Sequence, residues 1–336
     1  MKMLVIDGSS AEGGGQIPRT ALALSMVTGQ PFRIKNIRAR RRKPGLMRQH
    51  VTIIESAMRL CSAGVDGLGL GSSEFTFFPG DVRPGDYTFN AGRAVSISFL
   101  LQTILPVLAL AKGHSSVTFT GGIANPSAPP LEFLLKTYLP QLRKMGLEAS
   151  LKLDAPATAQ VGISRCLATI DPMVRFRPVS LMDRGVPMQR KAMTSVTSLT
   201  GHESGQEVRE FEKTLAMASS SLKDENRPTN VMLEMSYEGV TEIFTGFARP
   251  GVSQDAATAD AAKQARTYMS SNAAVCEFLA DQLLVPFALA GSGRLTTTRI
   301  SPHAKASMDT IRAFLGVEFY TELLPGGCWL LEVRRA

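Results

Sequence analysis

The sequence has few of the residues that build metal or disulfide sites. Its 336 residues include four cysteines and four histidines. The cysteines lie far apart and form no Cys-x-x-Cys pair, which excludes a zinc ribbon or a local redox pair and makes a disulfide scaffold improbable. No histidine lies near another histidine or a cysteine, so a histidine-based metal site has little support. We therefore interpret the cysteines as buried structural thiols: Cys61, Cys166, Cys276 and Cys328.

Long hydrophobic segments are also missing. The longest apolar run, Phe99 to Ala111, contains Gln102 and Pro106 and is too short to cross a bilayer. The N-terminal segment reaches Asp7 after only a few apolar residues, which is not the pattern of a signal peptide. We therefore expect a cytoplasmic globular protein, with room for one large domain or two ordinary ones.

Positive charge is concentrated in one segment. The formal net charge is +8 at pH 7, and no acidic residue separates the basic residues between Arg33 and Arg48. A run of lysines and arginines is often only a solvated face. This run, however, joins a predicted strand to the glycine-containing start of a helix, where loops gather around sites. It therefore favours a polyanionic partner such as nucleic acid or nucleotide phosphates.

The predicted elements recur in one order along the chain. Residues 3–78 have the pattern strand, helix, strand, helix, strand, strand, and residues 87–170 repeat it at a spacing of about 85 residues. A third, interrupted pass is visible at residues 273–333. The region before it is polar, with alternating strands and a helix-like stretch at residues 206–219.

These patterns predict an α/β (α+β) fold of three repeated β-α-β-α-β-β units. Residues 1–175 and 269–336 would form a discontinuous large domain that carries the catalytic site. Residues 176–268 would form a small α/β domain inserted in the third repeat, with turn-forming prolines and glycine at its borders.

A glycine-rich turn near the N-terminus is suited to bind an anion. Three consecutive glycines, residues 13–15, stand between a predicted strand and a helix, where backbone N–H groups and the helix dipole favour phosphate. The turn matches neither the dinucleotide fingerprint nor the P-loop, and a simple tight turn is the alternative. Glu12 beside it is placed to meet a phosphate-bound divalent cation, or merely to favour the helix dipole.

Other candidates are selected by their positions. Arg19 lies one helical turn beyond the glycines, and Gln49 and His50 lie near a helix start directly after the basic segment. A lone His50 would more often be structural, but its basic neighbours favour contact with phosphate. His303 follows a Ser-Pro pair at the start of a short helix, where a histidine is usually a cap or a surface residue. A neutral, oriented imidazole there can nevertheless attack the α-phosphorus of ATP.

Taken together, these segments closely resemble the RNA 3′-terminal phosphate cyclases over nearly the whole chain, although weakly within the insert. The order and spacing of the motifs are very specific. They are Asp7-Gly8, Glu12-Gly13-Gly14-Gly15-Gln16, Asn36-Ile37-Arg38, Lys43-Pro44-Gly45-Leu46, Arg48-Gln49-His50, Leu101-Gln102-Thr103, Asn125-Pro126-Ser127-Ala128-Pro129-Pro130 and Leu279-Ala280-Asp281-Gln282-Leu283.

The resemblance implies a ligase-type nucleotidyltransferase in RNA processing that uses ATP and Mg²⁺ or Mn²⁺. A histidine matching His303 takes AMP from ATP, and the AMP passes to an RNA 3′-phosphate. The vicinal 2′-OH then attacks and leaves a 2′,3′-cyclic phosphate. Such an enzyme must neutralise crowded phosphates and hold the reacting atoms in line.

The resemblance also assigns roles to residues. Glu12 would assist the divalent ion. The phosphates of ATP or of the RNA end would be held by Arg19, Arg38, Arg41, Gln49 and His50. Site geometry would depend on Gln102 and Gln282, and adenine would pack near Pro129, Phe278 and Asp281. Independently of the resemblance, Phe278, Asp281 and Gln282 fall on one face of a predicted helix, which supports a shared pocket.

Some loops depart from the family pattern and leave the choice of substrate open. The usual triple-glycine turn is absent from residues 154–162, a family glycine is missing at residues 92–96, Phe278 replaces a tyrosine, and Ala306-Ser307 replaces Thr-Asn. One alternative is an adenylating enzyme for another phosphate-ended substrate. Others are a non-catalytic ribosome-assembly factor of the same fold and a simple nucleic-acid-binding module. The sequence does not decide whether the chain forms a homodimer or accepts DNA ends.

Overall fold

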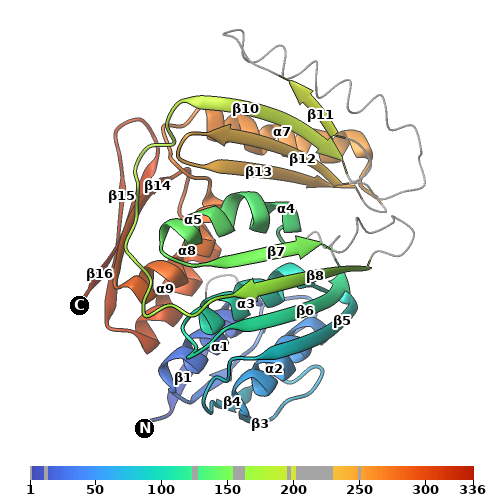
Figure 1. The fold of residues 1–336 in the computed structure, drawn as a ribbon, viewed down its shortest axis with the longest axis vertical. Coiled ribbons are helices and arrows are strands. Elements are labelled where there is room, and N and C mark those ends of the chain that lie inside the picture. Colours follow the sequence, from blue (N-terminus) through green and yellow to red (C-terminus); the bar gives the residue numbers. More distant parts are fainter. Residues whose placement is uncertain are drawn as a thin grey trace.

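A computed structural model describes residues 2–10, 14–122, 128–153, 163–194, 198–201, 230–248 and 251–336. Within these residues the chain forms several four-stranded sheets with helices packed between and beside them (Figure 1). The predicted mixed α/β class is confirmed. The domain borders remain a prediction.

The first sheet comes from the N-terminal part of the chain. Its strands, in spatial order, are β1 (Leu4–Asp7), β2 (Phe32–Lys35), β4 (Phe75–Phe78) and β3 (Gly64–Asp66). β1 and β2 pair in parallel and the other neighbours are antiparallel. The helices of this unit are α1 (Gln16–Thr28) and α2 (Arg48–Cys61). Alternating strand residues such as Phe32, Phe75 and Phe77 are buried, as one covered sheet face requires.

The second sheet has the same strand order. Its strands, in spatial order, are β5 (Asp86–Ser96), β6 (Ser115–Gly122), β8 (Ile163–Ile170) and β7 (Ala149–Leu153). Its helices are α3 (Ile97–Ala109), α4 (Leu131–Phe133), the π-helical turn η1 (Leu134–Tyr138) and α5 (Leu139–Lys144). π-Helical turns occur often at functional sites, and this one ends at Tyr138.

The third sheet joins segments far apart in the sequence. Its strands, in spatial order, are β9 (Ser180–Leu181), β14 (Ser292–Thr297), β16 (Trp329–Arg335) and β15 (Val317–Leu323). The first pair is again parallel and the others antiparallel. Its helices are α8 (Glu277–Ala290) and α9 (Pro302–Phe314). β9 was not predicted, because two residues give no periodic signal.

Between β9 and β14 the chain builds what we call the upper module, residues 187–269. Its strands, in spatial order, are β11 (Ser198–Gly201), β10 (Pro187–Thr194), β12 (Asn230–Tyr237) and β13 (Thr241–Phe247). All neighbours are antiparallel, and α7 (Gln254–Met269) packs against β12 and β13. The module lies above the helices of the second unit (Figure 1). The helix expected at residues 206–219 lies outside the described residues.

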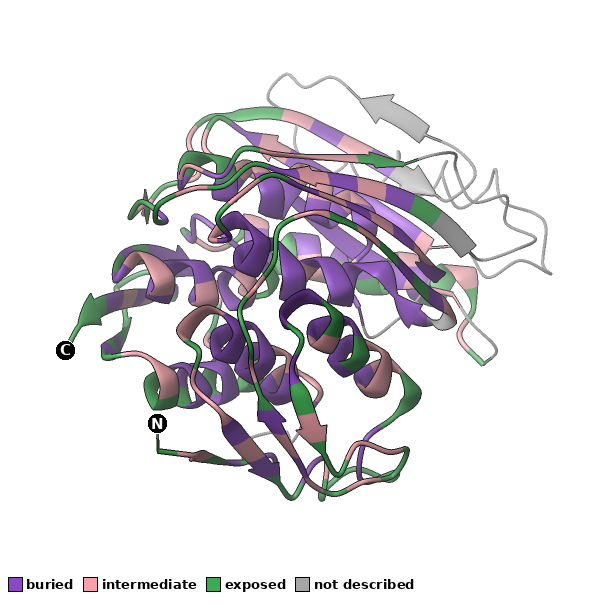
Figure 2. Cartoon of the chain, turned by 60° about the horizontal axis from the view of Figure 1, so that its bottom comes forward, coloured by how far each residue is buried: buried purple, intermediate pink, exposed green. Residues whose placement is uncertain are grey.

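The hydrophobic core is formed largely by the helices that pack between the sheets. All but one residue of α3 are buried, so this helix is covered on every side, as a uniformly apolar helix should be. α1 packs against α3 and α9, and α8 packs against α9 and η1. Figure 2 shows these central helices largely in the buried colour, with exposed positions on the outer elements.

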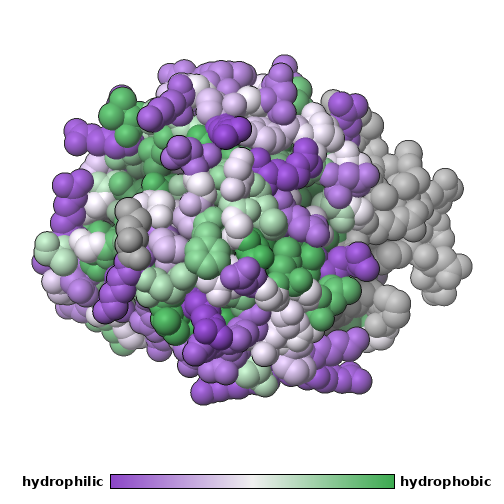
Figure 3. Space-filling view, turned by 90° about the horizontal axis from the view of Figure 1, so that it is seen from below, coloured by the Kyte–Doolittle hydropathy of each residue, from purple (hydrophilic) through white to green (hydrophobic). Residues whose placement is uncertain are grey.

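The outer surface mixes polar and apolar side chains. Seen from below, hydrophobic areas are interrupted throughout by hydrophilic side chains (Figure 3). Among the described residues, every helix is too short or too polar to span a bilayer.

Candidate active site

The last two residues of the glycine-rich turn form the centre at which several predicted site residues meet. A Cβ atom on Gly14 would lie 3.6 Å from Nη2 of Arg41 and 3.7 Å from Cε1 of His303. A Cβ atom on Gly15 would lie only 2.5 Å from Nε2 of His50 and 3.2 Å from Nη1 of Arg19. The absence of side chains therefore lets two arginines and two histidines approach one stretch of backbone.

His50 is buried in the first turn of α2 with a defined tautomer. Its Nδ1 accepts a hydrogen bond from the backbone N–H of Met47 at 2.9 Å. Burial, together with the charges of Arg19 and Arg38, lowers the pKa of His50 to about 3. The ring is therefore neutral at physiological pH, and its proton resides on Nε2, the atom that faces Gly15. Such a ring donates one hydrogen bond without carrying a charge.

Arg19 lines a small cavity between α1, α3 and α8. Its guanidinium donates to Oε1 of Gln16 at 2.5 Å and lies 4.0 Å above the ring of Phe99. Burial lowers the pKa of Arg19 to about 9, which still leaves it charged at neutral pH. The cavity, of about 30 Å³, is also lined by predicted site residues Gln102, Asp281 and Gln282.

Two buried polar atoms on the cavity wall have no hydrogen-bond partner among the described residues. They are Oγ1 of Thr20 and Nε2 of Gln102. Both atoms are inaccessible to solvent, although their residues line the cavity. A cavity of this volume holds a water molecule or one polar group of a ligand.

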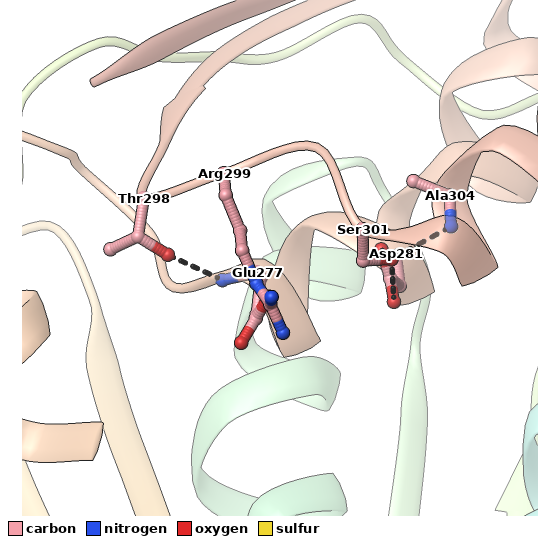
Figure 4. Close-up of polar contacts among 6 residues, drawn as sticks. All are labelled: Glu277, Asp281, Thr298, Arg299, Ser301 and Ala304. Carbon is pink, nitrogen blue, oxygen red and sulfur yellow. Dashed lines mark hydrogen bonds and ion pairs between the residues drawn. The ribbon is translucent and has the colours of Figure 1, made fainter. Parts of the chain in front are cut away.

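A hydrogen-bonded link joins Asp281, which lines the cavity, to the start of α9 through Ser301 (Figure 4). The hydroxyl of Ser301 lies 2.7 and 2.8 Å from the two carboxylate oxygens of the buried Asp281. The same hydroxyl oxygen accepts the backbone N–H of Ala304 at 2.8 Å and so caps α9. His303 is the second residue of that helix and is exposed to solvent. The capping serine thus positions the exposed imidazole at the positive end of the helix.

The basic loop after β2 is held in an unusual backbone conformation. Asn36 and Arg38 have φ angles of 57° and 55°, which non-glycine residues adopt rarely. The side chain of Asn36 donates to Asp7 at 3.2 Å, and that of Arg38 donates to the carbonyl of Lys43 at 3.1 Å. These bonds fold the loop back toward the end of β1. Burial and the neighbouring Arg41 lower the pKa of Arg38.

The remaining predicted residues are Gln49, Phe278, Pro129 and Glu12. Gln49 lies beside His50, with Nε2 atoms 3.4 Å apart. Phe278 is 42% exposed on α8, and Pro129 is half-buried just before α4. Neither of these two lines the cavity described above. Glu12 lies outside the described residues.

Sequence reasoning missed three residues of this site: Thr20, Tyr138 and Ser301. Thr20 and Tyr138 line the cavity, and their positions depend on tertiary packing that no local pattern reveals. Ser301 did carry a signal, because serine followed by proline is the usual start of a helix.

The chain is similar to known proteins over most of its length. A family model described as RNA 3′-terminal phosphate cyclase matches residues 10–321. The chain belongs to the RNA 3′-terminal phosphate cyclase family. A protein named RNA 3′-terminal phosphate cyclase from Koribacter versatilis is 43% identical over 325 residues, covering 95% of this chain and 92% of its own length.

Two further cyclases of the same name have similar identity. Those of Pseudomonas fluorescens and Ectopseudomonas mendocina are both 41% identical, covering 94% and 93% of this chain and the same shares of their own lengths. Among solved structures, the enolpyruvyl transferase NikO from Streptomyces tendae has a TM-score of 0.30 and 15% identity over 51% of this chain and 33% of its own. That likeness carries no argument.

The departures from the cyclase pattern lie mostly away from the described cavity. Ala306 and Ser307 are buried on α9 with exposures of 4% and 0%, facing the core. Gly92 lies in β5 with a φ of 65°, at an irregularity in its pairing with β6. Residues 154–162 lie outside the described part of the chain.

Proposed function

We propose that this chain converts an RNA 3′-terminal phosphate to a 2′,3′-cyclic phosphate, with ATP as the source of energy and His303 as the covalent acceptor of AMP. The observation that carries the proposal is the convergence of Arg19, Arg41, His50 and His303 on the backbone of Gly14 and Gly15. The names of the relatives support the RNA substrate, and the basic loop after β2 suits a polyanion.

ATP fits the chemistry of the site. Phosphate oxygens are acceptors, and the site offers guanidinium donors, the Nε2–H of His50 and the N–H groups at the start of α1. The cavity lined by Thr20 and Gln102 would receive one polar group of the ligand. Pro129 and Phe278 would hold the adenine, with Asp281 and Gln282 on the same helix as Phe278.

A divalent ion would be held by Glu12 and the phosphates of ATP. Among the described residues, no three potential metal-ligating side chains lie together. A magnesium or manganese ion that relies mainly on phosphate oxygens and water needs no more than one or two carboxylates. Its chemistry would be to neutralise phosphate charge.

The first step would form a bond between a nitrogen of His303 and the α-phosphorus of ATP, while the bond to the leaving pyrophosphate breaks. His303 loses a proton in this step. The capped start of α9 would hold the imidazole in line, and Arg19 and Arg41 would stabilise the charge that develops on the phosphates. The RNA 3′-phosphate would then displace His303, and the 2′-OH would displace AMP.

The first experiment is self-adenylation with ATP labelled at the α-phosphate, using His303→Ala and, as a matched control, His114→Ala. His114 is half-exposed and bonded to Asp171 at 2.6 Å, outside the site. We expect an acid-labile, alkali-stable label on the wild type and on the His114 variant, and none on the His303 variant. An unlabelled, folded wild type would overturn the adenylation step and favour a non-catalytic factor.

The acceptor is tested separately with RNA oligonucleotides that end in a 3′-phosphate. Formation of a 2′,3′-cyclic end with release of AMP is the expected result. Adenylated protein that leaves such RNA unchanged would indicate an enzyme for another phosphate-ended substrate, the alternative that the altered loops leave open.

A further inference from the structure

Glu242 is a wholly buried carboxylate at the start of β13 in the upper module. Its Oε1 accepts the backbone N–H of Cys276 at 2.6 Å, and its Oε2 accepts the thiol of the same residue at 3.1 Å. Cys276 is the N-cap residue of α8. One side chain of the module therefore caps a helix that belongs to the third unit of the large domain.

The chain around this contact is tightly bonded. The guanidinium of Arg184 donates to the carbonyls of Tyr268, Met269 and Ser271 at 2.9, 3.2 and 2.9 Å. It also lies 4.7 Å from the ring of Tyr268, whose hydroxyl donates to the carbonyl of Ala274 at 2.8 Å. The segment that leaves the module, residues 269–276, is thus held to the segment that enters it.

Residues 273–276 are not helical, although the sequence pattern predicts a helix from Ala273 to Ala290. The cause is pairing, since the N–H of Val275 donates to the carbonyl of Thr296 in β14 at 3.0 Å. α8 therefore begins at Glu277, directly after Cys276, the residue that Glu242 contacts. A carboxylate at this point also favours the positive end of the helix.

The first turns of α8 lead directly to the proposed nucleotide site. The N–H of Glu277 donates to Thr298 at 3.2 Å, and its carboxylate pairs with Arg299 (Figure 4). One turn later, Asp281 and Gln282 line the cavity, and Asp281 holds the cap of the His303 helix. A shift of the α8 N-terminus would consequently move both the cavity wall and the nucleophile.

We propose that Glu242 is a positioning residue through which the upper module fixes the N-terminus of α8 and thereby the geometry of the ATP site. The inference rests on the proposed function and gives the module a role in nucleotide binding. Glu242 touches no substrate and acts through Cys276 and α8.

A second buried carboxylate of the module provides a matched control. Glu234, 6% exposed on the neighbouring strand β12, pairs with Lys136 of η1 at 2.5 Å. It also joins the module to the large domain, but at η1 and not at α8. Loss of Glu234 tests the attachment of the upper module to the large domain. Loss of Glu242 tests that attachment and the position of α8 together.

The test compares Glu242→Ala, Glu242→Gln and Glu234→Ala in the full-length protein. The readouts are the dissociation constant for ATP by equilibrium dialysis, the rate of self-adenylation, and amide hydrogen exchange at residues 276–282. Misplacement by about 1 Å can cost about 100-fold in rate. We expect Glu242→Ala to weaken ATP binding at least about tenfold and to speed exchange at residues 276–282.

Glu242→Gln keeps an oxygen that accepts the Cys276 N–H, so it should restore ATP binding to within about threefold of the wild type. If Glu242→Ala does not fold, Cys276→Pro removes the same bond from the other side, since the φ of −77° at Cys276 accommodates proline. It should weaken ATP binding as Glu242→Ala would.

Three results would overturn the inference: unchanged ATP binding in Glu242→Ala, an equal loss in Glu234→Ala, or no rescue by Glu242→Gln. A wild type that binds ATP without being labelled overturns the proposed adenylation while the comparison of dissociation constants still stands. A wild type that does not bind ATP overturns both.

Discussion

Both carboxylate oxygens of Asp281 lie within hydrogen-bond distance of a single hydroxyl, that of Ser301, at 2.7 and 2.8 Å. The hydroxyl has one proton to donate, and it simultaneously accepts the N–H of Ala304. A residue expected to contact adenine is thereby connected to the helix that carries His303. Under the proposed function, nucleotide binding and orientation of the nucleophile would share this carboxylate.

Ser301→Ala should slow self-adenylation by on the order of tenfold or more, because α9 loses both its cap and its tie to Asp281. The loss of the cap alone should lower the free energy of unfolding by about 1 kcal/mol. The matched control is Ser253→Ala, which removes the cap of α7 at Ala256. Ser253→Ala should lower the free energy of unfolding by a similar amount and leave the rate of self-adenylation unchanged. Equal rates of self-adenylation in Ser301→Ala and Ser253→Ala would contradict the role of the Asp281–Ser301 bond.

Gly15→Ala should destabilise the protein, because the new Cβ would lie 2.5 Å from Nε2 of His50. The φ of −69° at Gly15 is open to alanine, so the effect is steric and not conformational. Overpacking of this kind costs about 1–3 kcal/mol, measurable by urea unfolding. Gly14→Ala, whose Cβ would meet nothing closer than 3.6 Å, should change the unfolding free energy little.

His50 should make the protein less stable in acid. Its pKa is about 3 in the folded state, against 6.5 for an unperturbed histidine, so the unfolded chain binds the proton first. The contribution of His50 to the free energy of unfolding is complete above pH 6.5 and is lost as the pH falls toward 3. The loss is on the order of 3 kcal/mol by pH 4. Unfolding of His50→Gln should show a smaller loss between pH 6.5 and 4, whereas His114→Gln should follow the wild type.

Glu242 should have the opposite effect on stability. Burial raises its pKa to about 7 from 4.5, so the folded chain binds the proton first. Its contribution is complete below pH 4.5 and is lost as the pH rises through 7, on the order of 3 kcal/mol in all. The pKa values of the facing groups Cys276 and Tyr268 are raised by burial, so both stay neutral in this window. Glu242→Gln should flatten the decline between pH 5 and 8, and an unchanged slope would refute this assignment.

Much of the fold was predictable because its helices and strands have strong periodic patterns. The alternating pattern predicts a strand at Val317–Leu323, the bounds that β15 has in the structure. The helical patterns near Gln16–Met26 and Gly45–Cys61 differ from α1 and α2 only at their ends. α7 was not identified, since its buried face is largely alanine and contrasts weakly with its exposed face. The start of α8 was misjudged because Val275 pairs with β14, a contact that is distant in sequence.

The candidate site was predictable where a residue type and its local position suffice. Arg19 and His50 were selected by their places beside a glycine turn and a basic loop, and His303 was selected through the resemblance to the cyclases. Three-dimensional contacts between helices and strands determine the position of Thr20, the Asp281–Ser301 bond and the bond between Glu242 and Cys276. No spacing in one sequence encodes those distances.

The parallel pairing of β9 with β14 has a consequence for the order in which the chain folds. The partners Ser180 and Arg294 are 114 positions apart, and everything between them must emerge from the ribosome before the pair can form. The upper module is synthesised in this interval. The third sheet forms only afterwards, because both ends of this long loop must be present before it can close, and its closure has an entropic cost. β9, the earliest strand of that sheet to be synthesised, therefore cannot take its place until β14 has been made.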